Sequence, residues 1–555
     1  MNLSEVYKNK YFEILLLLFL GLILVIIFSI FVPYNMDEFA AYHLITCYAY
    51  KYNYLNIFNE GCTAYFLNFL NTGLMLPLRT YFYMGSLPSL YYLPLFLIWK
   101  SPVSARFLGI IFLVIQSLIL STIFKIKTRY IFSGLILFFP YFFKHIVDPG
   151  LAGFQITAVF LIVYLFIKWN EKFKITYLLL ASVVIFLGIW TNLTFVWFIP
   201  SLIILFITQC IENKKRIIKK NNLKKIVIQL FYALILLLGL LSLLFLSFDL
   251  NNKPYLYTLI SSDNSKVYSI NEMLDVKNYI INSPVFQALI NPFLSTKEIY
   301  MVESPSYFVY VYDIFIYLSI PLLWLILVLK KKSKTQILKS IIFFALFIFT
   351  VIIIIWTKAA WEHHAVMAYP FLILSFLTAV KTFKETDIIF FKINFNKIMA
   401  IWLILFMIVN CYFFFSFQNQ HLIDHDNPPK RQMAKDLVDL NINKLLYDPY
   451  LAENYFYVIT EWGMYRYQAL YGNKNQGVFY IEPLNTLDQI NLLKDISKKY
   501  NRKLLFVYHT GQSSVSNYSL IQESFFLKQC NAIKNNSKWK IMLELDNSSK
   551  NICFK

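Results

Sequence analysis

Long apolar runs separated by short polar segments make up most of this chain of 555 residues. About eleven runs are long enough to cross a bilayer, each with roughly 17 to 23 residues, the length that a transmembrane helix needs. Lysines cluster in alternate connections between the runs. The pattern predicts a polytopic helical membrane protein, with helices at 12–32, 105–124, 130–147, 151–168, 175–190, 193–211, 226–248, 309–329, 338–356, 365–380 and 398–416.

One further apolar stretch, 87–99, is short and contains two prolines. Its length is typical of an interfacial or re-entrant segment and not of a span. If it crossed the membrane, Lys125, Lys127 and Arg129 would lie outside, against the positive-inside rule. We therefore expect this stretch to stay on the outer surface, which brings every lysine cluster to the cytoplasmic side.

The same topology predicts which polar residues share the outer face. The outer regions would be 33–104, the turn at Asp148, the loop 249–308 and the turn that ends at 364. The charged and titratable side chains that can then converge on this face are Asp37, Glu38, Asp148, Glu362, His363 and His364.

From about residue 418 the composition becomes polar, and short apolar runs alternate with helical patterns. The runs that begin at Lys444, Gly477, Lys503 and Lys540 are predicted as strands. Helices are expected at 429–440, 486–500 and 516–533. The predicted fold is an all-α polytopic membrane domain, 1–416, with outer loops 33–104 and 249–308, followed by a small extracytoplasmic α/β domain, 417–555.

Composition supports this class. The chain is 58% hydrophobic and 15% charged, with a mean hydropathy of +0.56, which excludes an ordinary soluble globule. Its net charge of +20 comes from clusters beside apolar runs, as in cytoplasmic anchors, so nucleic acid is not an expected partner. Lys8 and Lys10 precede a run too long for a signal-peptide core. We expect an uncleaved first helix, a cytoplasmic N-terminus and a plasma (inner) membrane location.

The six cysteines leave two interpretations open. Cys47 and Cys62 share the first outer loop, and Cys530 and Cys553 share the outer domain. In an oxidising compartment each pair can form a disulfide, and free buried thiols fit equally well. No cysteine and histidine spacing matches a zinc site, and no glycine-rich phosphate loop is present. A nucleotide-sugar substrate is therefore not expected on this face.

Three segments together carry a family resemblance. An Asp-Glu pair follows the first span in 31–40 (FVPYNMDEFA), an outer segment 83–94 reads YMGSLPSLYYLP, and SPVSARF opens the next helix at 101–107. In this order they resemble the polytopic GT-C glycosyltransferases, such as protein O-mannosyltransferases and aminoarabinose transferases. The resemblance covers roughly 12–380. It implies transfer of a sugar, with inversion, from a polyprenyl-phosphate carrier to a glycan, lipid or protein acceptor at the outer face.

The resemblance implies catalytic roles for three acids. Asp37 matches the essential acidic residue and would be the general base that deprotonates the acceptor. Glu38 matches its partner, and Asp148 matches a second outer acid near the donor. Partial burial at the membrane edge raises the pKa of a carboxyl group and makes it a stronger proton acceptor. The carrier supplies the activation, so no cofactor is implied, while a need for a divalent metal stays open.

It also implies a set of substrate-binding residues. Arg106 matches an arginine that would hold the donor phosphate, which suits the fork geometry of guanidinium. The segment 85–89, GSLPS, replaces the Lys-Pro-Pro or His-Pro-Pro turn of many members, which leaves Arg79 and Lys100 as candidates for the second phosphate contact. His363 and His364 occupy a place where relatives often carry a basic residue facing the carrier.

Each of these residues allows a plainer interpretation. Asp37 and Glu38 suit the start of an amphipathic helix near Phe39. Asp148 precedes Pro and Gly in a typical turn. Arg106 can reach lipid headgroups without binding substrate, and the two histidines can be interfacial residues with no ligand.

Two other membrane functions remain as alternatives. A transporter or flippase for lipid-linked glycans needs ionisable residues or broken helices at mid-membrane, whereas the charges here cluster at span ends. An oligosaccharide ligase or polymerase would place essential basic residues in a long late loop, and 249–307 contains no arginine.

Overall fold

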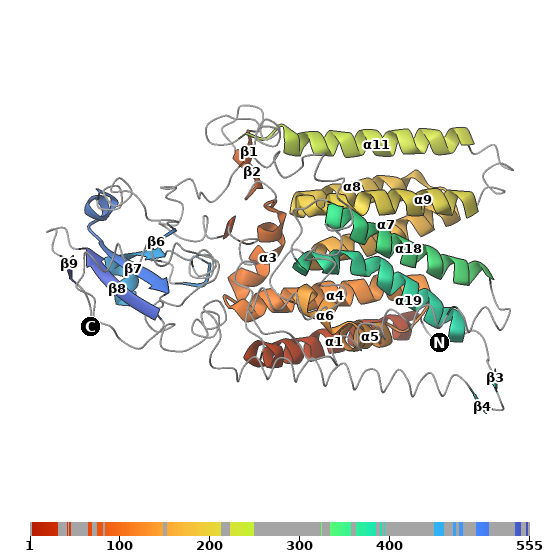
Figure 1. The fold of residues 1–555 in the computed structure, drawn as a ribbon, viewed down its shortest axis with the longest axis horizontal. Coiled ribbons are helices and arrows are strands. Elements are labelled where there is room, and N and C mark those ends of the chain that lie inside the picture. The colour runs from red at the N-terminus through yellow and green to blue at the C-terminus, as the bar shows by residue number, and fades with distance from the viewer. Residues whose placement is uncertain are drawn as a thin grey trace.

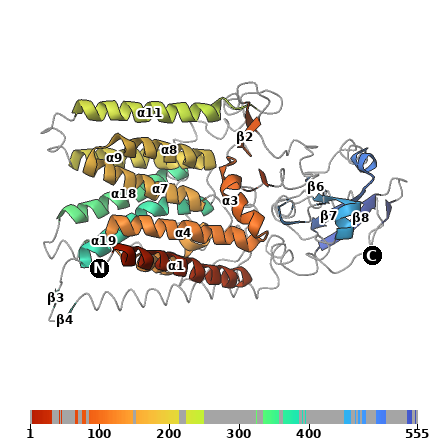
Figure 2. The same ribbon diagram turned by 180° about the vertical axis from the view of Figure 1, so that it is seen from behind.

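The chain forms a bundle of long helices with a small β-sheet beyond one end (Figure 1; Figure 2). This computed structural model describes residues 3–31, 42, 44–45, 65–68, 75–80, 84–147, 152–212, 223–248, 324, 334–356, 362–384, 389–390, 393–394, 449–459, 465, 470–472, 475, 477–480, 495–509, 539–545 and 551–552.

Each predicted span within the described residues is helical in the structure. The predicted spans 309–329 and 398–416 lie outside the described residues, except for Trp324. The helices are α1 (Leu3–Phe31), α4 (Pro102–Phe124), α5 (Thr128–Phe138), α6 (Pro140–Val147), α7 (Ala152–Lys172), α8 (Ile175–Thr191), η2 (Leu193–Phe198), α9 (Ile199–Glu212), α11 (Leu223–Phe245), α18 (Lys334–Trp356), η4 (Glu362–Ala368) and α19 (Tyr369–Lys384).

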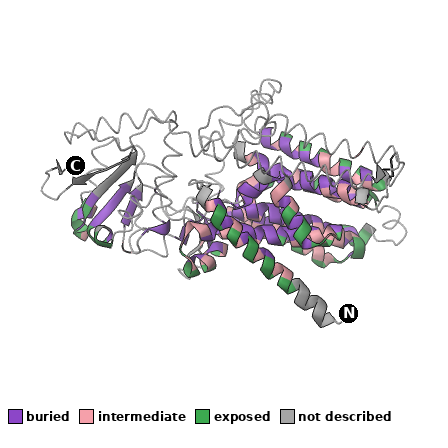
Figure 3. Cartoon of the chain, turned by 90° about the horizontal axis from the view of Figure 1, so that it is seen from below, coloured by how far each residue is buried: buried purple, intermediate pink, exposed green. Residues whose placement is uncertain are grey.

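In the described part of the chain, seven segments are long and apolar enough to cross a membrane: Tyr11–Ser29, Pro102–Phe124, Ala152–Lys172, Leu193–Glu212, Lys224–Phe245, Thr335–Trp356 and His364–Thr382. The share of buried residues in the most apolar stretch is 83% for the segment that contains α19 and 67% for α7. It is only 22% for α1 and 17% for α11. Exposed side chains therefore follow the outer helices (Figure 3). Because these exposed side chains are largely apolar, lipid must solvate them. The predicted polytopic helical membrane protein is confirmed.

The predicted span 130–147 is two helices and not one. α5 ends at Phe138 and α6 begins at Pro140. Proline lacks an amide hydrogen and clashes with the preceding turn, so it starts helices and interrupts them. After the break, α6 contacts α4 and α7.

The short apolar stretch forms α3 (Leu87–Ile98), a helix of 12 residues with Pro94 inside it. Such a helix is about 18 Å long, well short of the ~30 Å hydrocarbon layer. It lies across one end of the bundle, and α4 then runs back along the other helices (Figure 1). The expectation that this stretch does not span agrees with the structure.

The lysine-bearing turns gather at the opposite end from α3. The amide of Arg129 donates to Oε1 of Glu13 at 3.2 Å, which ties the α4–α5 turn to the N-terminal half of α1. Lys339 of α18 pairs with Glu212 of α9 at 3.2 Å. We call this the lysine end, with Lys125, Lys127, Arg129, Lys172, Lys174, Lys224 and Lys225, and the opposite one the α3 end.

Small residues allow close helix contacts in the bundle core. A Cβ atom on Gly109 of α4 would clash with the carbonyl oxygen of Ile146 and lie 2.6 Å from Cα of Val147, both in α6. Nearby, Nε2 of Gln116 donates to Oγ1 of Thr157 in α7 at 3.0 Å. Close backbone approach and interhelical hydrogen bonds are the usual means of packing helices in lipid.

The C-terminal strands form one mixed sheet in the order β6-β5-β7-β8-β9. The three strands at the β6 side are parallel, and β8 and β9 are added antiparallel. Three predicted strand runs are strands here, whereas β5 was not predicted and the run at Lys444 lies outside the described residues. The strands are β5 (Tyr455–Ile459), β6 (Gly477–Tyr480), β7 (Lys503–His509), β8 (Trp539–Leu545) and β9 (Asn551–Ile552), with the short helix α23 (Pro449–Asn454) before them.

Two small hairpins complete the described elements. β1 (Tyr65–Asn68) pairs with β2 (Met75–Arg79) in the segment between α1 and α3, where no strand was predicted. β3 (Ile389–Phe390) pairs with β4 (Ile393–Asn394) after α19.

The close contact at Gly109 predicts a large effect of a single methyl group. Gly109→Ala should destabilise the bundle by about 1–3 kcal/mol, because the added Cβ meets backbone atoms of α6 that cannot move independently. Gly239→Ala in α11 is the matched control, since nothing lies within 4 Å of its Cβ position. It should be neutral or stabilising by up to about 1 kcal/mol. Thermal unfolding of both variants in one detergent measures this, and equal unfolding temperatures would contradict the α4–α6 contact.

The arrangement of the ends predicts a labelling pattern. In a variant whose cysteines are all replaced by serine, single cysteines at Lys127 and Lys172 should react with an impermeant maleimide from the same side of the membrane. A cysteine at Lys100, which follows α3, should react only from the other side. The pattern is read in intact and permeabilised cells. Labelling of positions 100 and 127 from one side would mean that α3 or its neighbours cross differently.

Candidate functional site

The candidate acids and cysteines of the sequence lie outside the described residues. Asp37, Glu38 and Asp148 are among them, and so are Cys47, Cys62, Cys530 and Cys553. The described chain stops at Phe31, six positions before Asp37, and at Val147, the residue before Asp148. Their catalytic and disulfide roles stay predictions, while the basic candidates can be located.

Arg106 lies in the second turn of α4, fully buried at the α3 end. Ser101 caps this helix, because its side chain accepts a hydrogen bond from the amide of Val103, and Pro102 occupies the first turn. Nη1 of Arg106 donates to Oγ of Ser29 at 3.3 Å. Its guanidinium carbon lies 4.8 Å from the centre of the Phe28 ring, a cation–π contact. Arg106 thereby joins the start of α4 to the last turn of α1.

Arg79 ends strand β2 and is also fully buried. The backbone around it is fixed to the end of α8, where the amide of Gly85 donates to the carbonyl of Thr191 at 3.0 Å. The indole of Trp190 donates to the carbonyl of Leu78 at 2.8 Å. A Cβ on Gly85 would overlap the Trp190 carbonyl, so only glycine fits. These contacts position a second arginine at the α3 end.

Lys144 is a third buried cation, which the sequence analysis did not single out. It is 1% exposed and lies in the last turn of α6. Phe143, its neighbour, packs edge-on against Phe28 with ring centres 5.6 Å apart, and Phe28 also underlies Arg106. The last turn of α6 therefore lies beside Arg106. The sequence could have indicated Lys144, because a lysine at the predicted outer end of a span departs from the positive-inside rule.

His364 lies beside this region in η4. Its ring meets the Trp197 ring of η2 edge-on, with centres 5.1 Å apart. η4 also contacts α6, the helix that carries Lys144. For His363 the structure describes only the backbone.

Lys100 contacts the C-terminal part of the chain. Its ammonium group donates to the carbonyl of Gly472 at 2.5 Å, and the hydroxyls of Tyr92 and Tyr471 lie 3.0 Å apart. The Tyr92 hydroxyl also lies 2.6 Å from Oγ of Ser104, two positions before Arg106. The segment at Tyr471 thus closes over α3 close to the start of α4. Desolvation in this contact lowers the pKa of Lys100 to about 8.

α3 itself is anchored to the bundle by an aromatic stack. The Tyr91 ring stacks on Phe154 of α7 at 5.5 Å and meets Phe112 of α4 edge-on at 5.4 Å. Burial raises the pKa of the Tyr91 phenol far above its ordinary range, so this group stays protonated. The anchor holds α3 across the ends of α4 and α7.

The three buried cations, Arg79, Arg106 and Lys144, make the α3 end suited to an anion. Charges in a low-dielectric environment attract counter-charges much more strongly than charges in water. Guanidinium groups in particular can bind a phosphate through two parallel hydrogen bonds. Among the described residues no cluster of three His, Cys, Asp or Glu side chains could hold a metal ion.

No protein-family model and no curated protein sequence matches this chain. The assignment of its chemistry therefore depends on the residues themselves.

The partial desolvation of the Lys100 ammonium group predicts an unusual reactivity with pH. Desolvation disfavours the ammonium form, so the amine should lose its proton near pH 8 instead of near its ordinary pKa of 10.5. Acetylation of Lys100, followed by mass spectrometry of its peptide, should reach half its maximal rate near pH 8. Tyr471→Ala should loosen the covering segment and move the midpoint toward pH 10. A midpoint above pH 10 in the unaltered protein would contradict the contact with Gly472.

Proposed function

We propose that this protein is a membrane-embedded glycosyltransferase that uses a polyprenyl-phosphate-linked sugar and works at the α3 end of the bundle. The observation that supports this best is the group of three buried cations, Arg79, Arg106 and Lys144, at one end of a membrane bundle. A lipid-borne phosphate is the anion that reaches such a place laterally from the bilayer. The acceptor, a glycan, lipid or protein, would enter from the aqueous side.

The proposed orientation follows the charge distribution. Lys125, Lys127, Arg129 and the other cations of the lysine end would face the cytoplasm, as the positive-inside rule requires. The α3 end and the C-terminal sheet would then face the exterior of the plasma membrane. This orientation places the site on the side where lipid-linked sugars are used without nucleotides.

In the proposed reaction Asp37 accepts the proton of the acceptor hydroxyl. The acceptor oxygen forms a bond to the anomeric carbon as the bond from that carbon to the phosphate oxygen breaks, with inversion. The leaving group is polyprenyl phosphate, which keeps the electron pair and gains negative charge. Arg106 and Arg79 would stabilise this charge, because preorganised cations act most strongly where charge develops in a dry site.

Chain connectivity is compatible with these roles. Ser29, which binds Arg106, is eight positions before Asp37, and eight extended residues reach at most about 28 Å. Asp148 directly follows α6, whose last turn lies beside Arg106. Glu38 and Asp148 would support the base, and His363 and His364 of η4 would face the carrier.

Asp37→Asn should abolish transfer, by roughly 10²–10⁴-fold, because a general base is lost while the charge-independent contacts remain. The assay uses the full chain in nanodiscs and radiolabelled undecaprenyl-phosphate mannose, glucose or aminoarabinose as the donor. Glu13→Gln at the lysine end is the matched control and should keep full activity. Full activity of Asp37→Asn would remove the assigned base.

The arginine is tested by a second matched pair. Arg106→Gln should lower turnover sharply and Arg106→Lys less so, whereas Arg129→Gln, at the exposed lysine end, should not. Because Arg106 is buried, the unfolding temperature of each variant is measured beside its activity. In a deletion strain, mass spectrometry should show accumulation of a polyprenyl-phosphate-linked sugar. Unchanged lipid-linked sugars together with unchanged surface glycans would contradict the proposal, and movement of the donor across the membrane with its sugar uncleaved would indicate a flippase.

A further inference from the structure

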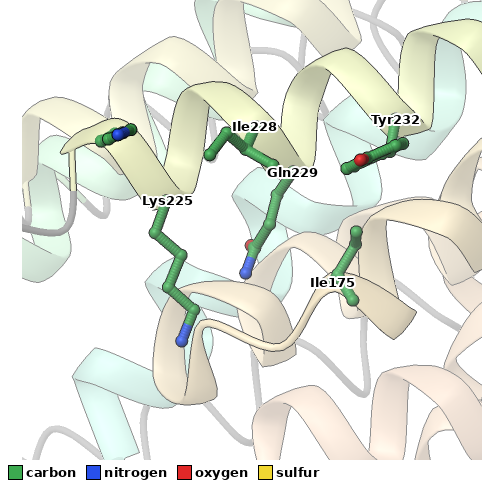
Figure 4. A pocket seen from close by; sticks show the side chains of 6 residues that line it. Ile175, Lys225, Ile228, Gln229 and Tyr232 are labelled. Carbon is green, nitrogen blue, oxygen red and sulfur yellow. The ribbon is translucent and has the colours of Figure 1, made fainter.

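A cavity lies between α8 and α11 at the lysine end, far along the bundle from Arg79 and Arg106. Its volume is about 450 Å³. Figure 4 shows Lys225, Gln229 and Tyr232 extending from α11 toward the start of α8, where Ile175 faces them. The lining residues are Ile175 from α8 and Lys224, Lys225, Ile228, Gln229 and Tyr232 from α11.

The inner wall of the cavity is fixed by a buried amide. Oε1 of Gln229 accepts a hydrogen bond from the indole of Trp169 at 2.9 Å, and Nε2 donates to the carbonyl of Phe173 at 3.1 Å. Gln229 is 5% exposed. These two bonds tie α11 to the end of α7 and to the α7–α8 turn. An amide nitrogen carries two hydrogens, so Gln229 has one more donor to offer at this wall.

The cavity is positively charged. Lys224 and Lys225 are exposed on α11, and no acid is among the lining residues. The acids of the neighbouring helices pair with other lysines, Glu171 with Lys168 at 2.7 Å and Glu212 with Lys339 at 3.2 Å. The two lysines of the cavity are therefore suited to bind an anionic ligand.

An apolar strip continues the cavity along α11. Ile228, Tyr232 and Ile235 follow one another at helical spacing on one face, and they are 43%, 54% and 50% exposed. The cationic pocket at the end of α11 continues into an exposed apolar strip. This arrangement is complementary to an anionic phospholipid, with the phosphate at the level of the lysines and an acyl chain along the strip.

We propose that the cavity between α8 and α11 is a specific binding site for one anionic phospholipid. Lys224, Lys225 and the hydroxyl of Tyr232 bind the phosphate and the charged headgroup, and an acyl chain lies on Ile228 and Ile235. A zwitterionic headgroup carries its own cation, which the two lysines repel. The site is separate from the α3 end and does not depend on the chemistry proposed there.

The test uses the full chain in detergent, titrated with palmitoyl-oleoyl phosphatidylglycerol or phosphatidylcholine and observed by native mass spectrometry. One phosphatidylglycerol should bind more tightly than phosphatidylcholine. The double variant Lys224→Gln/Lys225→Gln should weaken its Kd about tenfold or more, because two charge-assisted contacts are lost. Lys125→Gln/Lys127→Gln is the matched control, with the same charge change at the same end but outside the cavity, and should bind as the unaltered protein does.

Two further measurements locate the lipid and identify its source of affinity. Ile228→Trp fills the cavity with both lysines kept, and it should also lose the tight phosphatidylglycerol. Soluble glycerol phosphate should compete only weakly, because it lacks the acyl chain. Equal binding of the two lipids, equal losses in both double variants, full binding by Ile228→Trp, or strong competition by glycerol phosphate would each overturn the proposal.

Discussion

The constraint on which the rest of this structure depends is the length of α3. A helix of 12 residues is too short to cross the hydrocarbon layer by itself, and α3 lies across one end of the bundle (Figure 1). α4 therefore begins at that end and runs away from it along the bundle (Figure 1). The contact between Arg129 and Glu13 is the local consequence, since it returns the chain to the end where α1 began. One short helix thus separates a lysine end from an end that carries buried cations.

Those buried cations are the costly part of the bundle. Taking a guanidinium from water into a protein interior disfavours folding by several kcal/mol unless acceptors or counter-charges surround it. Arg106 obtains a hydroxyl from Ser29 and the face of Phe28, and Arg79 is held where β2 meets the end of α8. These partners reduce the cost of burying the cations. In the proposed function, a lipid-borne phosphate would be a further counter-charge at this end.

The sequence predicted the parts of the fold that depend on local hydrophobicity. Apolar runs located the helices within the described residues, because this signal is set by the bilayer and not by tertiary contacts. The charge distribution predicted the surface position of α3, and that position stays a prediction. The break at Pro140 could have been predicted, because proline lacks the amide hydrogen that a continuous helix needs. Hydropathy alone does not detect this break. β5 has the aromatic and β-branched composition of a strand, Tyr-Phe-Tyr-Val-Ile, and was not recognised. The β1–β2 hairpin has no comparable signal.

The candidate site was predictable only in part, for a physical reason. Arg106 was found through its place in a motif, whereas the burial of Arg79 depends on Gly85 and Trp190, which meet only in the folded chain. The acids Asp37, Glu38 and Asp148 remain predictions.

The contact between Tyr92 and Tyr471 joins residues that are 379 positions apart. Ribosomes deliver chains from the N-terminus, and early segments fold first. Tyr92, Phe96 and Lys100 are therefore made and inserted long before their partner is translated. Completion of this end of the protein must wait for nearly the whole chain, so truncated products of interrupted synthesis would carry an unfinished and uncovered α3.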